Sequence, residues 1–139
     1  MKNRKDVILI TGSSKRIGKE IVLGLSRFNK NYKFILHYNN SAKEAKNLKT
    51  KLEKDKIDSK IIKFDLSNAD KIKDFGKEVE RLFGRVDVLI NNASIFIEKE
   101  LHAITNNDFD EMINVNLKSP FLLSKFLSIG MKKRKYGKK

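Results

Sequence analysis

The chain has 139 residues, of which 40% are hydrophobic, and carries a formal net charge of +14 with no cysteine. This length suits a single domain, and the apolar content excludes wholesale disorder. A chain without cysteine has no disulfide, thiol nucleophile or thiolate metal site, and no apolar run here reaches the ~18 residues of a membrane helix. We therefore expect a cytoplasmic protein with no membrane partner.

The positive charge is spread unevenly along the chain. Residues 1–60 carry a net charge of +10, residues 61–124 carry −3, and residues 125–139 carry +7. A basic tail suits a nucleic-acid-binding protein, whose affinity would depend strongly on salt. A compositional bias is the alternative, because lysine lies on every polar face and arginine, which suits bidentate phosphate contacts, occurs only six times. We favour the bias and expect no nucleic-acid partner.

Predicted strands and helices alternate along the chain. A continuous apolar run predicts a buried strand over residues 6–10, and apolar residues at steps of three and four predict a helix over residues 16–28. Repeated strand–helix units of this kind predict an α/β fold with a parallel sheet and helices on both faces. The further elements are a strand at 33–37, a helix capped by Ser41 and ending near residue 56, a strand at 59–64, a helix from 67 or 68 to 83, a strand at 86–90, and a helix from 107 to near 134 that Pro120 interrupts.

A glycine turn joins the first strand to the first helix, with the sequence Thr11-Gly-Ser-Ser-Lys-Arg-Ile-Gly18. Backbone N–H groups and the positive end of a helix can approach a phosphate at such a turn. A Walker A loop does not fit, because five residues separate the glycines and Lys19 is followed by Glu20 instead of a Ser or Thr that would hold Mg²⁺. We expect no metal site. The remaining interpretation is a dinucleotide-binding turn with Arg16 in place of the middle glycine.

The end of the second strand indicates which dinucleotide the turn would bind. NAD-binding folds place an Asp or Glu about 20 residues after the glycine turn, where it binds the ribose 2′-hydroxyl. Here residues 37–41 read His-Tyr-Asn-Asn-Ser, without an acid, while Lys15 and Arg16 supply cations that suit a 2′-phosphate. NADP(H) is therefore favoured over NAD(H). His37 either belongs to the cofactor site or is a strand residue whose ring faces a helix or solvent.

Four motifs together resemble the short-chain dehydrogenase/reductase family in order and spacing. They are Thr11-Gly12-x3-Arg16-x-Gly18, Asp65-Leu66, Asn91-Asn92-Ala93-Ser94 and Asn114-Val115-Asn116-Leu117. The resemblance covers the whole chain. It implies a Rossmann-like three-layer αβα arrangement with about four parallel strands in the order 3-2-1-4. Residues 1–139 would then be the NADP(H)-binding part of one domain of a short-chain oxidoreductase.

The resemblance also implies which residues hold the cofactor and the substrate. Arg16, the segment His37-Tyr38-x-x-Ser41 and Asn-Ala-Ser in place of Asn-Ala-Gly are similar to the pteridine reductase branch, although Asn40 stands where that branch usually has Arg. In that branch Arg16, Ser94 and Phe96 would contact a pterin or dihydrofolate-like ring; ketoacyl and sugar substrates remain open. The implied cofactor-binding residues are Gly12, Ser14, Lys15, Arg16, Ile17, Gly18, His37, Asn40, Ser41, Asp65, Leu66, Asn91, Ala93 and Ser94.

Hydride transfer in this family uses a Ser, a Tyr-x3-Lys pair and an Asn of the fourth helix. Only the Asn is matched here, by Asn116. Tyr136 does not match, because its lysine partner would be residue 140. The resemblance therefore implies an N-terminal portion of a reductase, without turnover and poorly soluble because an apolar strand edge and helix faces would be exposed. The alternatives are a residual nucleotide-binding module and the product of a decaying gene. The family is usually homo-oligomeric, and the sequence leaves this chain's oligomeric state open.

Overall fold

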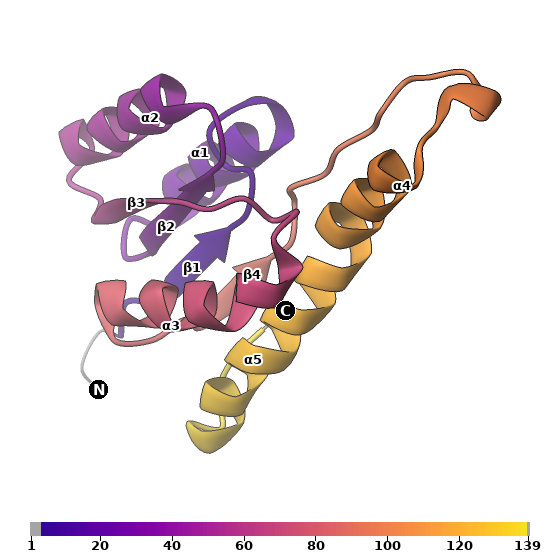
Figure 1. Cartoon of the computed structure of the whole chain (residues 1–139). Helices are drawn as coiled ribbons and strands as arrows, with labels where there is room; N and C mark the ends of the chain where they lie inside the picture. Colours follow the sequence, from indigo (N-terminus) through magenta and orange to yellow (C-terminus); the bar gives the residue numbers. More distant parts are fainter. Residues whose placement is uncertain (1–3, 139) are drawn as a thin grey trace.

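A four-stranded parallel sheet forms the centre of the computed structural model, which describes residues 4–138. The strands lie in the order β3-β2-β1-β4, which confirms the predicted α/β fold and its strand order (Figure 1). In the register of the sheet, Ile8 of β1 lies between Phe34 of β2 and Val88 of β4. The strand bounds are β1 Val7–Ile10, β2 Lys33–Tyr38, β3 Ser59–Lys63 and β4 Val88–Ile90.

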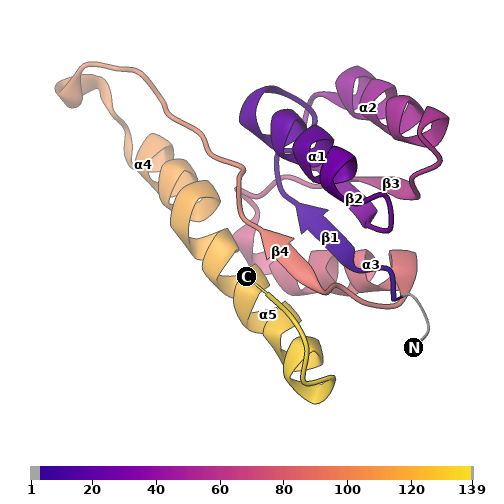
Figure 2. The same cartoon turned by 180° about the vertical axis from the view of Figure 1, so that it is seen from behind.

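Helices cover both faces of this sheet. Helices α1 and α2 lie on one face and helices α3 and α5 on the other, as Figures 1 and 2 show from opposite sides. Within residues 4–138 no helix is long and apolar enough to cross a bilayer. The helix bounds are α1 Arg16–Phe28, α2 Ala42–Lys54, α3 Ile72–Phe83, α4 Asn106–Ile113 and α5 Ser119–Lys133, with short 3₁₀ turns at Ala69–Lys71 and Leu101–Ala103.

Strand β1 contributes to two separate hydrophobic cores. Ile8 and Ile10 pack in a cluster with Val22 of α1, whereas Leu9 joins a second cluster with Phe75 of α3. No side chain of β1 is more than 2% exposed. Burial on both faces explains the continuous apolar run, and each fully buried aliphatic side chain contributes about 1.5–3 kcal/mol. The end of β1, where the glycine turn begins, is therefore rigidly placed.

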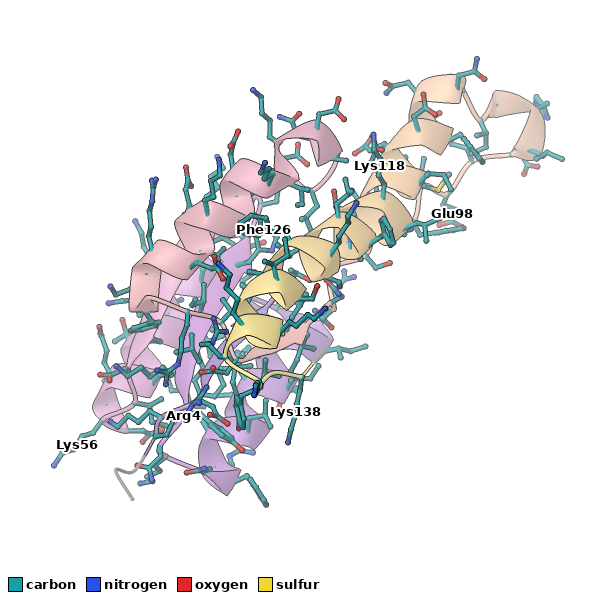
Figure 3. The ribbon with its side chains drawn as sticks, turned by 90° about the horizontal axis from the view of Figure 1, so that it is seen from below. Arg4, Lys56, Glu98, Lys118, Phe126 and Lys138 are labelled. Carbon is teal, nitrogen blue, oxygen red and sulfur yellow. The ribbon has the colours of Figure 1, made fainter. Side chains whose placement is uncertain are left out.

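The long C-terminal helix is irregular just before Pro120 rather than at it. A π turn at Asn114–Lys118 joins α4 to α5, and Pro120 lies in the first turn of α5. Pro120 has no N–H to donate to the carbonyl of Asn116, four residues earlier, which is a physical reason for the change of register at this place. Further along α5, Phe126 packs against α3 so closely that a Cβ on Gly76 would meet its ring (Figure 3).

Two helix starts differ from each other in how they are capped. Ser41 occupies the N-cap position of α2, but its side chain makes no capping hydrogen bond among the described residues, so its predicted capping role is wrong. Helix α4, in contrast, has a complete capping box. Thr105 Oγ1 accepts from the Asp108 amide at 3.1 Å, and the Asp108 carboxylate accepts from the Thr105 amide at 2.9 Å. Hydrogen bonds from the Lys99 ammonium, the Thr105 amide and the Thr105 hydroxyl to the carboxylate lower the pKa of Asp108 to about 2.

The outer edge of β4 is partly paired, which corrects the expectation of a bare edge. Lys138 N–H donates to the carbonyl of Asp87 at 2.8 Å, and the Leu89 amide donates to the carbonyl of Lys138 at 3.0 Å. These bonds form a parallel bridge between Lys138 and Val88. Exposed apolar helix faces are present as expected. Large side chains that are 56–63% exposed on α4, the π turn and α5 are Phe109, Leu117, Phe121 and Ile129.

Candidate nucleotide-binding site

An open cavity of about 450 Å³ lies at the carboxyl ends of the parallel strands. Open α/β sheets bind ligands at this edge, because the loops that follow neighbouring strands meet there. The cavity brings together most of the residues that the sequence predicts to bind a cofactor. Those that line it are Gly12, Ser14, Lys15, Arg16, Ile17, Gly18, His37, Asn40, Ser41, Asp65, Leu66, Ala93 and Ser94.

The glycine turn is shaped by two glycines that have different roles. Gly12 has a φ of +63°, which favours glycine, and a Cβ there would lie 2.9 Å from the Cα of Ala93. A Cβ on Gly18 would lie 2.3 Å from the carbonyl oxygen of Gly12, so this glycine lets the helix start fold over the turn. Arg16 also has a positive φ, of 48°. This is uncommon for a residue with a Cβ, whereas a glycine adopts such a φ without strain.

The first turn of α1 leaves backbone N–H groups available. Lys15 is the N-cap residue, no side chain in the described part of the chain caps the helix, and the first turn holds no acid. The first amide to bond back along the helix is that of Lys19, which donates to the carbonyl of Lys15 at 3.2 Å. The preceding amides have no intrahelical acceptor, and the helix dipole makes this end positive. An anion can therefore bind at the mouth of the cavity.

His37 supports the glycine turn from below. It is 2% exposed; its Nδ1 accepts from the Gly12 amide at 3.0 Å, and its Nε2 lies 2.9 Å from the carbonyl of Phe64. A ring that accepts at Nδ1 and donates at Nε2 is neutral. Burial lowers the pKa of His37. This effect outweighs the Phe64 carbonyl and the charge of Asp65, both of which raise the pKa. The ring thus links the ends of β1, β2 and β3 and positions the turn.

A second set of bonds joins the turn to the segment after β4. Thr11 Oγ1 accepts from the amides of Asn92 and Ala93, both at 3.0 Å. The Asn92 side-chain amide donates to the carbonyls of Thr11 at 2.9 Å and Gly12 at 3.1 Å. The sequence did not predict these hydrogen bonds of Thr11 and Asn92, although both residues lie inside quoted motifs. The two loops form one hydrogen-bonded unit around the cavity.

Three predicted site residues lie outside the cavity lining. Asn91 points toward α5, where its side-chain amide donates to Ser124 Oγ at 3.1 Å. Phe96 is 83% exposed. Asn116 holds the backbone of Ile95 at both ends: its Oδ1 accepts from the Ile95 amide at 2.9 Å, and its Nδ2 donates to the Ile95 carbonyl at 2.8 Å. Lining residues that sequence reasoning did not select are Tyr38, Asn39, Asn92, Ile95, Glu111 and Val115.

Charge is distributed asymmetrically around the cavity. Lys15 and Arg16 are exposed at the glycine turn, and neither takes part in an ion pair within residues 4–138. The facing end of β2 supplies hydroxyl and amide groups without a carboxylate. The acids that line the cavity, Asp65 and Glu111, follow β3 and lie on α4 respectively. The side formed by the glycine turn and the end of β2 is therefore the one suited to a phosphate.

The parallel sheet in the order 3-2-1-4, with a glycine turn leading from β1 into α1 at the cavity, defines a Rossmann-type α/β protein. The family model described as short chain dehydrogenase matches residues 6–138, and the chain belongs to this family. A relative is the 3-oxoacyl-[acyl-carrier-protein] reductase FabG of Buchnera aphidicola subsp. Baizongia pistaciae. It is 37% identical over 99% of this chain and 54% of its own length.

Solved structures give the same assignment. A 3-oxoacyl (acyl-carrier-protein) reductase from Agrobacterium tumefaciens C58 with NADP bound is 30% identical, with a TM-score of 0.85 over 96% of this chain and 50% of its own. The FolM alternative dihydrofolate reductase 1 from Brucella canis, complexed with NADP, is 26% identical, with a TM-score of 0.80 over 89% of this chain and 49% of its own. The chain thus spans about half the length of these relatives.

Proposed function

We propose that residues 1–139 are the NADP(H)-binding part of a short-chain reductase domain. The observation that carries this proposal is that Lys15 and Arg16 form no ion pair within residues 4–138 and lie at the start of α1, facing a strand end without a carboxylate. A carboxylate there would favour a ribose 2′-hydroxyl, whereas two cations favour a 2′-phosphate. The NADP found in related structures supports the same cofactor.

The residues of the cavity fit this cofactor. The free amides at the start of α1 would hold the pyrophosphate, with Gly12 and Gly18 allowing close approach. Asp65 and Leu66 would lie near the adenine, and Ala93 and Ser94 near the ribose and pyrophosphate. When bound, the cofactor supplies the hydride. The chain's own role is to orient the nucleotide and to exclude water from one side of it.

For the substrate we propose a pterin or dihydrofolate-like ring. Arg16, Ser94 and Phe96 would contact it; the largely exposed ring of Phe96 is free to stack on a planar ligand. The relative that reduces dihydrofolate supports this class. A carbonyl substrate is the second candidate, favoured by the 37% identity to a 3-oxoacyl reductase.

Residues 1–139 alone should bind the cofactor without turnover. Asn116 matches the family's catalytic Asn, and both polar atoms of its side chain bond to the backbone of Ile95. It would therefore act by positioning that segment. Tyr136 donates its hydroxyl to Asp6 at 2.6 Å, and this bond raises the pKa of Tyr136. A proton donor of this family needs a lowered pKa, so Tyr136 does not suit that role.

Fluorescence titration of the 139-residue chain with NADPH and NADH tests the cofactor. We expect saturable NADPH binding that is about 10- to 100-fold tighter than NADH binding, the range expected for charge-assisted bonds to a phosphate. The double variant Lys15→Gln/Arg16→Gln should narrow this ratio. Fluorescence titration of the NADPH-saturated chain with a dihydropterin or an acetoacetyl thioester then compares the binding of the two substrate classes. Absence of saturable binding of either nucleotide would contradict the proposal and leave a decayed gene product.

A further inference from the structure

A second cavity, of about 340 Å³, lies between α1 and α2. It shares Ser14, Lys15 and Arg16 with the nucleotide-binding cavity, so the two lie next to each other at the start of α1. Its other cationic lining residues are Lys19 of α1 and Lys51 of α2. We refer to it as the α1–α2 groove. No motif identified in the sequence accounts for it.

The groove holds an excess of positive charge. Four cations line it, and the only acid among its lining residues within the described part of the chain is Glu44. Neither Lys19 nor Lys51 takes part in an ion pair within residues 4–138. Lys49, two residues before Lys51 on the same helix, does pair with Glu53. The cations of the groove thus remain available where a neighbouring lysine is neutralised.

This arrangement favours a bound anion. Cations around one opening repel one another and make the local electrostatic potential positive. A bound anion reduces this repulsion. Lys15 and Lys19 are one helical turn apart at the positive end of α1, so the helix dipole adds to the same field. Asn47 adds an amide to the lining. The groove has the charge and the donors that recognise a phosphate group.

We propose that Lys19 and Lys51 are further specificity-determining residues for the 2′-phosphate of an adenine nucleotide. This rests on the proposed function, because it places that nucleotide in the adjoining cavity. The end of β2 lines the nucleotide-binding cavity with the uncharged residues Tyr38, Asn39, Asn40 and Ser41. Lys51 of α2, which lines the neighbouring groove, would supply a cation that this strand end lacks. Because the amides at the start of α1 would hold the pyrophosphate, the groove on the α2 side would be left for the ribose phosphate.

The test compares two double variants of the 139-residue chain. Lys19→Gln/Lys51→Gln removes both charges from the groove, and Lys46→Gln/Lys73→Gln removes two exposed lysines that line neither cavity. At low ionic strength the groove variant should bind NADPH about fivefold more weakly, with a difference that shrinks as salt rises. Its affinity for NADH should not change, and the control variant should match the wild type with both nucleotides.

Each other outcome decides between the two proposals. If the wild type binds NADPH and the groove variant binds it equally well, the role of Lys19 and Lys51 is overturned while the proposed function stands. Equal weakening of NADPH and NADH binding also overturns it, because the lysines then act on a part common to both. If the wild type binds neither nucleotide, the proposed function fails first. A competition experiment adds a further criterion. If 2′-AMP but not 5′-AMP displaces NADPH from the wild type, and this displacement is lost in the groove variant, the groove binds the ribose phosphate as proposed. If inorganic phosphate alone displaces NADPH at the same concentration, the groove is a general anion site and the proposal is overturned.

Discussion

The two ends of the sheet use positive charge in opposite ways. At the amino end, Arg4 and Arg85 are paired with the buried carboxylate of Asp87. At the carboxyl end, Lys15 and Arg16 border an open cavity and take part in no ion pair within residues 4–138. The first arrangement closes and stabilises the fold, and the second leaves charge for a ligand. The net charge of +14 is therefore divided between these uses, with many lysines simply on the surface.

The amino end is a closed polar cluster. Asp87 is 0% exposed and accepts from Arg4 at 2.6 Å, from Arg85 at 2.8 Å and from the Val7 amide at 3.0 Å. Burial alone would raise the pKa of Asp87, but these donors outweigh burial and hold the pKa below its usual value. Arg4 and Lys138 lie at this same end (Figure 3). The cluster ties both terminal segments to β4.

Removal of the Asp87 carboxylate should have the largest effect. Asp87→Ala should lower the free energy of unfolding by about 3 kcal/mol, because it leaves arginine charges and the Val7 amide without their buried partner. Urea denaturation measures this change. In the matched variant Asp74→Ala, an exposed carboxylate 3.5 Å from Lys77 is lost, and the change should stay within about 0.5 kcal/mol. If Asp87→Ala also weakened NADPH binding by the folded chain, the two ends would not be independent.

A methyl group in the glycine turn should damage the carboxyl end instead. Gly18→Ala places a Cβ 2.3 Å from the Gly12 carbonyl and 2.6 Å from the Asn92 side chain, so the turn must shift. We expect a loss of about 1–3 kcal/mol of stability from overpacking, together with loss of nucleotide binding. Thermal denaturation and NADPH titration measure the two effects.

The control for Gly18 lies on the same helix. A Cβ on Gly24 of α1 meets nothing within 4 Å, and alanine is a better helix former than glycine. Gly24→Ala should therefore raise the stability by up to about 1 kcal/mol and leave NADPH binding unchanged. Equal effects of the two substitutions would show that close packing at the turn does not control the site.

The sequence predicted the fold and most of the cavity, because both depend on local patterns. Buried apolar runs such as residues 7–10 and the positions of Gly12 and Gly18 are local signals, and they correctly placed the strands and the turn. The cluster around Asp87 was not predicted, since it joins residues about 80 positions apart in the chain. The α1–α2 groove was not predicted for the same reason, because Lys19 and Lys51 come together only through the packing of two helices. For His37, the pattern gave two alternatives and could not show that its ring bonds to Gly12.

His37 gives the carboxyl end a pH dependence that the amino end lacks in the same range. The folded chain holds this ring neutral, with a pKa lowered from 6.5, whereas the unfolded chain takes up a proton near pH 6.5. The unfolded state therefore binds more protons below that pH, and stability should fall as the pH drops from 6.5 toward the folded pKa. Asp87 has a lowered pKa as well, so its contribution is lost only below pH 3.8, its unfolded value.

Urea denaturation at several values between pH 7.5 and about pH 5 measures this effect. His37→Gln should reduce the pH dependence while retaining a group that can accept from the Gly12 amide and donate to the Phe64 carbonyl. The control variant His102→Gln changes the other histidine, which is exposed, and should retain the pH dependence of the wild type. NADPH affinity of the folded wild type should not change at any pH above the folded pKa of His37, because the ring stays neutral there and Nδ1 still accepts from the Gly12 amide. A pH dependence that persists unchanged in His37→Gln would assign it to another group and would separate the histidine from the function of the turn.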